Sequence, residues 1–239
     1  MANILVLQHS EKGRPGRIGR ALRDHGFRLD IRRPDRADPL PPDLDDIHGL
    51  LVLGGPQNVD EGHDWMRTEK SLIAQAHAAE LPVVGICLGC QLIAEALGGE
   101  VARMPQPEQG FAPVTLTIAG QTEPLLAGVP WTHHQFQSHA YGVTRLPAEA
   151  VLLMSSSASP VQAFRVGLRT CAFQFHFEVD RAMVEAFSAD DDFNARAGVD
   201  RAALARQAEE HYDRFAVIAD RIVENLLTYT FPATTLLRV

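Results

Sequence analysis

Cysteine is scarce in this chain, with three residues among 239. Domains held together by disulfides are much richer in cysteine, so the count excludes a disulfide framework and favours a reducing compartment. Long apolar runs are also missing, since no segment approaches the roughly 18 residues needed to span a membrane. Residues 1–7 are too short and lack the basic flank of a signal peptide. We therefore expect a cytoplasmic protein with no membrane partner.

Positive charge is in short supply as well. The chain has 22 Lys and Arg residues against 30 Asp and Glu, a formal net charge of -8. An acidic protein repels phosphate backbones and anionic lipid surfaces, so nucleic acid is not an expected partner. With 46% hydrophobic and 22% charged residues, the composition is that of an ordinary globular protein, and the length suits one sizeable α/β domain.

The first hundred residues alternate between buried strands and amphipathic helices. Apolar runs at 4–7, 49–53 and 83–86 predict strands, and helical periodicity extends over about 16–25 and 64–80. Alternation of this kind predicts a parallel sheet with helices on both faces. In such folds, ligands collect beyond the carboxyl ends of the strands.

Beyond residue 100, shorter apolar segments replace this alternation. They would extend the sheet as hairpins, and the predicted strands are 114–118, 136–138, 151–154, 161–165 and 170–175. A helix is expected to begin after Asp180, a suitable N-cap residue, and a long helix to cover 200–227. His133 and His134 are adjacent and would diverge in a strand, which favours a solvated pair over a pair of metal ligands.

One short stretch combines a buried strand with a reactive side chain. Cys87 follows the strand at 83–86 and precedes a predicted helix, with Gly85 and Gly89 on either side. A sharp turn of this kind lifts the side chain clear of the backbone and points it at the positive end of a helix. A thiol there has a larger thiolate fraction, so Cys87 is the candidate nucleophile.

A nucleophilic thiol needs a base within reach and a third group that orients this base. His176 and Glu178 end the last predicted strand, and in an extended segment they lie on the same face. The carboxylate of Glu178 would then hold the imidazole in one tautomer and stabilise its charged form. Either residue alone is more often a solvated side chain at a strand end, so the argument rests on the pair.

Cys87 and Cys90 also form a C-x-x-C pair, a pattern found in redox and metal sites. A metal site of this type usually needs a second pair, which Cys171 alone does not supply. A dithiol function would make the spacing of His176 and Glu178 coincidental. We therefore expect no metal and favour the interpretation of Cys87 as a nucleophile.

Several short motifs together resemble the class I, triad-type glutamine amidotransferase family. Residues 85–91 (Gly-Ile-Cys-Leu-Gly-Cys-Gln) look like the family's G-x-C-x-G-x-Q turn, and residues 175–178 contain its H-x-E motif. The other similar segments, in the family's order, are 53–56 (a glycine turn), 109–114 and 136–140.

The resemblance implies a reaction without a cofactor, in which Cys87 attacks the side-chain amide of glutamine, forms a γ-glutamyl thioester and releases ammonia. His176 would move the protons, and Glu178 would orient the imidazole. The implied site residues are Cys87, His176 and Glu178 in the catalytic triad, Gly55 and Leu88 in the oxyanion hole, and Gly54, Gln91, Ser138 and His139 in substrate binding.

The resemblance also implies the architecture, a flavodoxin-like, open, mostly parallel sheet with helices on both faces. We expect the amidotransferase domain to cover residues 1–187 and a C-terminal helical extension, residues 188–239, to pack on the same domain. Cys90 and Ala140 stand where the family often has histidine and glycine, and Phe177 replaces a proline. Tyr141 stands where relatives linked to synthetases tend to carry aspartate. The departures at Ala140 and Tyr141 suggest a changed pocket wall or acceptor interface.

The sequence looks most like stand-alone relatives of the GMP synthase amidotransferase domain, which leaves the acceptor of the ammonia open. Besides a small-molecule substrate, a second copy in a homodimer and a separate acceptor or synthetase subunit stay open as partners. The same thioester chemistry would serve a γ-glutamyl peptidase that hydrolyses γ-glutamyl peptides or conjugates. A non-catalytic regulatory module is a third interpretation, against which the intact Cys87, His176 and Glu178 argue.

Overall fold

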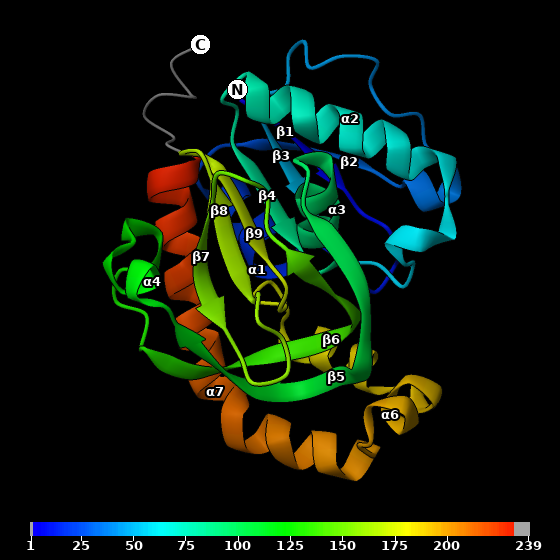
Figure 1. Ribbon diagram of the computed structural model, residues 1–239, viewed down its shortest axis with the longest axis vertical. Coiled ribbons are helices and arrows are strands. Elements are labelled where there is room, and N and C mark those ends of the chain that lie inside the picture. The colour runs from blue at the N-terminus through cyan, green and yellow to red at the C-terminus, as the bar shows by residue number, and fades with distance from the viewer. Residues whose placement is uncertain (1, 232–239) are drawn as a thin grey trace.

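Nine strands form one sheet within residues 2–231, the part of the chain that the computed structural model describes (Figure 1). Their order across the sheet is β2-β1-β3-β4-β9-β8-β7-β5-β6. The first five positions hold the parallel strands β2 (Arg28–Arg32), β1 (Asn3–Leu7), β3 (Gly49–Val52), β4 (Val83–Ile86) and β9 (Thr170–Phe173). The antiparallel strands are β8 (Ala163–Val166), β7 (Ala150–Ser155), β5 (Glu100–Leu116) and β6 (Thr132–Arg145).

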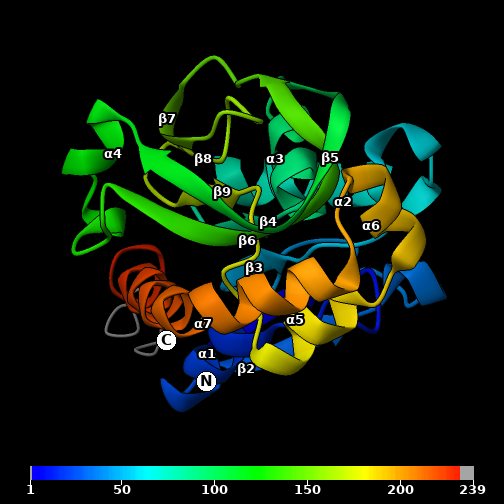
Figure 2. The same ribbon diagram turned by 90° about the horizontal axis from the view of Figure 1, so that it is seen from below.

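Helices cover both faces of the parallel half, which explains why its central strands are apolar along their whole length (Figures 1 and 2). Within β1, Ile4 and Val6 share a core with α1, α5 and α7, whereas Leu5 and Leu7 share the other core with α2 and α3. The helices are α1 (Gly16–Asp24), α2 (Asp64–Ala78), α3 (Leu88–Ala96), α4 (Ile118–Thr122), α5 (Arg181–Ser188), α6 (Asp191–Ala197) and α7 (Arg201–Asn225).

The predicted parallel sheet with helices on both faces is confirmed, and the late strands extend it as expected. β5 and β6 are much longer than the segments predicted at 114–118 and 136–138. The pairing of β5 is irregular between Arg103 and Glu108, a stretch that contains Pro105 and Pro107. Proline has no N–H to donate, so this part of a long strand looks like a loop in the sequence.

Three aspartates start the helices of the C-terminal region. The side chains of Asp180, Asp190 and Asp200 each accept a hydrogen bond from the backbone N–H three residues later. Helix α6, between the second and third of these, was not predicted. The predicted domain boundary at residue 187 falls in the last turn of α5 and stays a prediction. Residue 1 of the predicted amidotransferase domain and residues 232–239 of the predicted extension lie outside the described residues.

Within residues 2–231, no helix is both long and apolar enough to cross a membrane. The apolar side of α7 instead packs in the same core as the sheet, through residues such as Phe215, Ile218 and Ile222.

The histidine pair on β6 is not the solvated pair that adjacency favoured. His133 is 3% exposed, and its Nδ1 lies 2.8 Å from the carbonyl oxygen of Pro130. Its neighbour His134 points to the other side of β6 and stacks on His211 with ring centroids 4.0 Å apart. Burial lowers the pKa of His133 to about 4, because the charged imidazolium loses its hydration there.

We predict that His133 makes the fold sensitive to mild acid. In the unfolded chain its imidazole takes up a proton near pH 6.5, whereas in the folded chain it does so only near pH 4. The unfolded state therefore binds more protons in this window, and the free energy of unfolding should fall by about 3 kcal/mol as the pH drops through it. Urea unfolding at several pH values measures this slope.

The variant His133→Gln should flatten that pH dependence, and His25→Gln, at an exposed position of the helix α1 C-cap, should leave it unchanged. An equal slope in wild type and His133→Gln would contradict the prediction.

Candidate active site

Cys87 occupies the turn between β4 and α3 in a strained conformation, with φ 53° and ψ -108°. Its N–H donates to the carbonyl oxygen of Phe173 at 2.8 Å, which ties the turn to the end of β9. Close backbone contacts explain the flanking glycines. A Cβ on Gly85 would lie 2.6 Å from the carbonyl oxygen of Gly89, and a Cβ on Gly89 would overlap the carbonyl oxygen of Val52.

His176 and Glu178 lie just beyond the carboxyl end of β9. Phe175 and Phe177 alternate with them and are fully buried in the aromatic core, which turns the two polar side chains the other way. His176 Nδ1 lies 2.7 Å from Glu178 Oε1, and the two side chains are 2% and 1% exposed. Among the described residues His176 Nε2 has no hydrogen-bond partner, so this nitrogen stays available to a reacting group.

The neighbours of His176 decide its protonation. Burial of the ring by itself lowers the pKa, but the Glu178 carboxylate and the Cys87 thiol together raise the pKa of His176 well above its usual value. This shift favours the charged imidazolium, the form that is able to give a proton to a leaving group.

The glycine turn after β3 lies against both Cys87 and the imidazole of His176. A Cβ on Gly54 would lie 2.8 Å from His176 Cε1 and 3.3 Å from Cys87 Cβ, so a side chain does not fit there. A Cβ on Gly55 would lie 3.2 Å from Leu88 Cδ2, which places this residue beside the start of α3. Since Leu88 is the first residue of α3, its N–H has no acceptor within the helix.

A buried pair that sequence reasoning missed lies behind this turn. His9, which follows β1, and Glu69, in the middle of α2, are both fully buried, and His9 Nε2 is 3.0 Å from both carboxylate oxygens. His9 Nδ1 is 3.0 Å from the carbonyl oxygen of Leu53, and a Cβ on Gly55 would lie 2.5 Å from His9 Cβ. The pair therefore packs against the glycine turn and holds it in place. Its only sequence signal was a polar residue directly after a buried strand.

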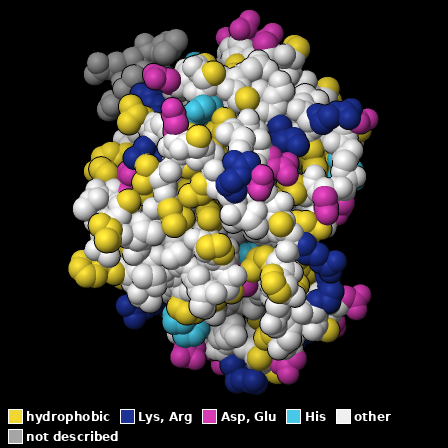
Figure 3. Space-filling view, in the orientation of Figure 1, with side chains coloured by type: hydrophobic (Ala, Val, Ile, Leu, Met, Phe, Trp, Pro, Cys, Tyr) yellow, Lys and Arg dark blue, Asp and Glu magenta, His cyan; other side chains and the backbone are white. Residues whose placement is uncertain are grey.

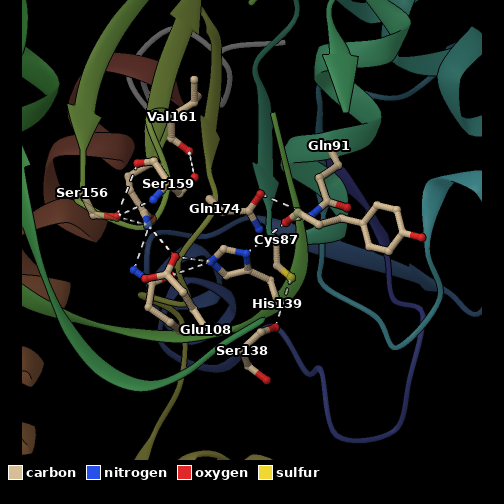
Figure 4. Close-up of polar contacts among 12 residues, drawn as sticks. Cys87, Gln91, Glu108, Ser138, His139, Ser156, Ser159, Val161 and Gln174 are labelled. Atoms are coloured by element: carbon tan, nitrogen blue, oxygen red, sulfur yellow. Dashed lines mark hydrogen bonds and ion pairs between the residues drawn. The ribbon is translucent and has the colours of Figure 1, made fainter. Parts of the chain in front are cut away.

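Ser138 and Gln91 lie on either side of the nucleophile (Figure 4). The carbonyl oxygen of Ser138 is 3.7 Å from Cys87 Sγ. The amide nitrogen of Gln91 lies 2.9 Å from the carbonyl oxygen of Tyr141 and 3.2 Å from Gln174 Oε1, so its donors serve the protein itself.

The ring of His139 turns away from the thiol into a polar network (Figure 4). His139 Nδ1 lies 2.9 Å from the carbonyl oxygen of Tyr141, and Nε2 lies 3.1 Å from both Glu108 Oε2 and Gln137 Oε1. Both ring nitrogens are therefore engaged within the protein.

Cys90 is buried in α3, on the helix that Cys87 precedes. Burial raises the pKa of its thiol well above the usual value, so it stays protonated and is unsuited to thiolate exchange. Among residues 2–231, no group of three or more His, Cys, Asp or Glu side chains is arranged to hold a metal ion.

The site opens into a cavity of about 670 Å³. Its buried end is formed by Gly55, Cys87, Leu88, Gln91, Ser138, His139 and His176. The remaining wall includes Tyr141, whose departure from the family pattern suggested a changed pocket wall or acceptor interface. It also includes residues that no motif indicated, namely Lys12, Arg103, Phe187, Phe193 and Arg196. Phe187 also packs on the imidazole of His176, with centroids 5.1 Å apart.

A family model, described as glutamine amidotransferase class-I, matches residues 15–186. The glutamine amidotransferase-like protein YfeJ of Salmonella typhimurium is 37% identical over 169 residues, which are 68% of this chain and 70% of YfeJ. The glutamine-hydrolyzing GMP synthase of Aeropyrum pernix is 35% identical over 162 residues. That match covers 68% of this chain but 30% of the larger enzyme, so the chain spans less than a third of it.

Solved structures of similar proteins have the same architecture. A glutamine amidotransferase from Methylobacillus flagellatus superposes with a TM-score of 0.86 over 96% of both chains, at 26% identity. A glutamine amidotransferase from Thermotoga maritima, at 23% identity, shares the fold with a TM-score of 0.82 over 95% of this chain and 98% of its own.

We predict that the strain at Cys87 is measurable. Cys87→Ala and Cys87→Gly both remove the thiol, but only the first keeps a Cβ at a φ of 53°. Because glycine adopts this conformation without strain, Cys87→Gly should be more stable than Cys87→Ala by about 1 kcal/mol, the reverse of the usual order. Thermal unfolding of the two variants, with Ala94→Gly in α3 as an ordinary helical control, measures the difference. A less stable Cys87→Gly would contradict the strain.

We also predict that His9 and Glu69 act as one unit in stability. Glu69→Leu leaves the buried His9 without its carboxylate and should cost about 3 kcal/mol of unfolding free energy. The double variant His9→Phe/Glu69→Leu leaves no buried group half-paired and should recover part of that loss. Urea unfolding of both single variants and the double variant gives the coupling energy, and simple additivity of the two losses would argue against a coupled pair.

Proposed function

This chain belongs to the class-I glutamine amidotransferase family, and from this membership we propose that it hydrolyses the side-chain amide of glutamine to glutamate and ammonia. One observation carries the proposal. The thiol of Cys87 after β4 and the imidazole of His176 after β9 meet around Gly54, and Glu178 lies 2.7 Å from the imidazole. This is the arrangement of a nucleophile, its base and an orienting carboxylate.

In the first step the Cys87 thiol passes its proton to His176, and Sγ attacks the amide carbon of glutamine. The carbonyl oxygen gains negative charge and is stabilised by the backbone N–H groups of Gly55 and Leu88. The second of these belongs to the first turn of α3, where the helix dipole favours an anion.

His176 then protonates the amide nitrogen, the C–N bond breaks, and ammonia leaves behind a γ-glutamyl thioester on Cys87. In the second half of the reaction His176 takes a proton from water, which attacks the thioester carbon and frees glutamate. Glu178 holds the imidazole through Nδ1 and stabilises its charged form, so that Nε2 faces the reacting atoms.

The proposed binding residues contribute in different ways. Gly54 allows the turn after β3 to approach both Cys87 and His176, and the Ser138 carbonyl borders the reacting atoms at 3.7 Å from Sγ. The internal hydrogen bonds of Gln91 and His139 support a role in holding the β6 backbone that forms the wall.

The ammonia would pass to an acceptor on a separate polypeptide. Support comes from the name of a relative, a glutamine-hydrolyzing GMP synthase subunit of Thermoplasma volcanium, which is 35% identical over 138 residues, 57% of this chain and 65% of its own length. A cytoplasmic location belongs to the same proposal, and a homodimer stays a prediction.

Ammonia release from glutamine tests the proposed triad. Cys87→Ser should lose at least about a thousandfold in kcat, and Glu178→Gln about a hundredfold, with folding unchanged by circular dichroism. Unchanged turnover in Cys87→Ser would refute the proposed reaction.

The pH profile gives a test of the proton transfer. Because the carboxylate raises the pKa of His176, Glu178→Gln should lower this pKa and move the alkaline limb of kcat/KM to lower pH. As a control, Asp64→Asn, whose exposed carboxylate pairs with Arg67 on α2, should leave the limb in place. An identical limb in wild type and Glu178→Gln would remove the pair from the acid step.

A further inference from the structure

The cavity is larger than glutamine requires. A volume of about 670 Å³ is typical of pockets that bury drug-sized ligands, which are several times the size of an amino acid. Cys87 and His176 lie at its buried end, whereas Lys12, Arg103 and Arg196 are exposed residues that line its outer part. The outer part therefore stays unoccupied when glutamine lies at the buried end, beside Cys87 and His176.

Hydrogen bonds hold the wall of this outer part in place. Gln106 Nε2 donates to the carbonyl oxygen of Ala197 at 3.0 Å, which joins α6 to β5, and Figures 1 and 2 show the two elements side by side. Arg201 donates to the carbonyl oxygen of Ala189 at 2.7 Å and to the Asp191 carboxylate at 2.9 Å, which fixes the start of α6. All of α6 lies beyond residues 15–186, the part that the family model matches.

Positive charge collects on this wall although the chain has a net charge of -8. Arg196 lies over the ring of Phe193 at 5.1 Å, and within residues 2–231 neither it, Arg103 nor Lys12 forms an ion pair with a carboxylate. Figure 3 shows Lys and Arg side chains together at the level of β5 and α6. Two acidic residues also line the cavity: the carboxylate of Glu11 pairs with Arg36, and Asp190 Oδ1 accepts a hydrogen bond from the N–H of Phe193.

The leaving group of the reaction lies toward this wall. His176 must reach the nitrogen that departs, so the amine half of a substrate extends on the imidazole's side of the thiol. Phe187 of α5 packs on that imidazole, and the next helix, α6, contributes Phe193 and Arg196 to the cavity.

From this charge and position we infer that the outer part of the cavity binds a carboxylate on the amine half of a γ-glutamyl substrate, with Arg103 and Arg196 as its cations. Glutamine releases neutral ammonia, which gives these cations nothing to bind. A γ-glutamyl amino acid or short peptide carries a further carboxylate beyond the scissile bond. The inference rests on the proposed thioester chemistry of Cys87.

The reaction follows the steps proposed for glutamine, with an amino acid in place of ammonia as the leaving group. Cys87 Sγ bonds to the γ-carbonyl carbon, His176 gives its proton to the nitrogen, and the C–N bond breaks to release the free amino acid. Water then hydrolyses the thioester, so that a γ-glutamyl amino acid and one water yield glutamate and an amino acid.

Two matched substrates test the inference. γ-Glutamylglycine and γ-glutamylglycinamide differ only in the terminal carboxylate, and glutamine serves as the reference in each assay. Wild type should prefer the carboxylate by about tenfold in kcat/KM. The double variant Arg103→Gln/Arg196→Gln should bring that ratio close to one, and added salt should lower the ratio in wild type.

Arg67→Gln is the matched control, because Arg67 is exposed on α2 and outside the cavity, paired with Asp64. It should keep the wild-type ratio. Calorimetric binding of the two peptides to Cys87→Ser gives the same comparison without turnover, with tighter binding of the carboxylate expected.

Two results would overturn the inference while leaving the proposed function intact. In one, the enzyme hydrolyses glutamine but does not prefer γ-glutamylglycine over γ-glutamylglycinamide. In the other, that preference remains in the double variant. Hydrolysis of neither glutamine nor the two peptides would overturn both.

Discussion

The candidate site depends on how closely the ends of β3, β4 and β9 approach one another. At Gly54 an added Cβ would lie 2.8 Å from the imidazole of His176 and 3.3 Å from Cys87 Cβ, and at Gly89 it would overlap the backbone of β3. Neighbouring parallel strands end at the same edge of a sheet, and glycine allows their continuing turns to touch. With any larger residue there, the thiol, the imidazole and the amides of Gly55 and Leu88 would be held apart.

Buried polar pairs hold these turns in place. The His176–Glu178 pair faces the cavity, and the His9–Glu69 pair supports the glycine turn from the opposite side. Burial of charge is costly unless each group is matched by a partner, and here each imidazole has its carboxylate within 3.0 Å. Turns built around such pairs keep one geometry, which a reaction that places a thiol, an acid and an oxyanion together requires.

A different part of the chain forms the outer wall of the cavity. Helix α6 and the irregular part of β5 form the outer wall of the cavity, and α6 lies beyond the family match that ends at residue 186. A change of side chains in α6 would therefore alter the outer wall without changing the residues at the buried end of the cavity. In this chain the positive charge of Arg103 and Arg196 gives that wall its chemical character.

The sequence by itself determined the parallel sheet and the residues at its strand ends, because apolar periodicity and glycine turns are local properties. Cys87 and the pair His176 and Glu178 were found in this way, as were the glycines around them. Only the tertiary structure decided the contact of His9 with Glu69, the burial of His133 and the position of α6 over the cavity. Each of these joins residues far apart in the chain. The prolines of β5 made a strand that forms part of the wall look like a loop in the sequence. Local pattern specifies which side chains stand at the end of a strand, whereas long-range packing decides what faces them.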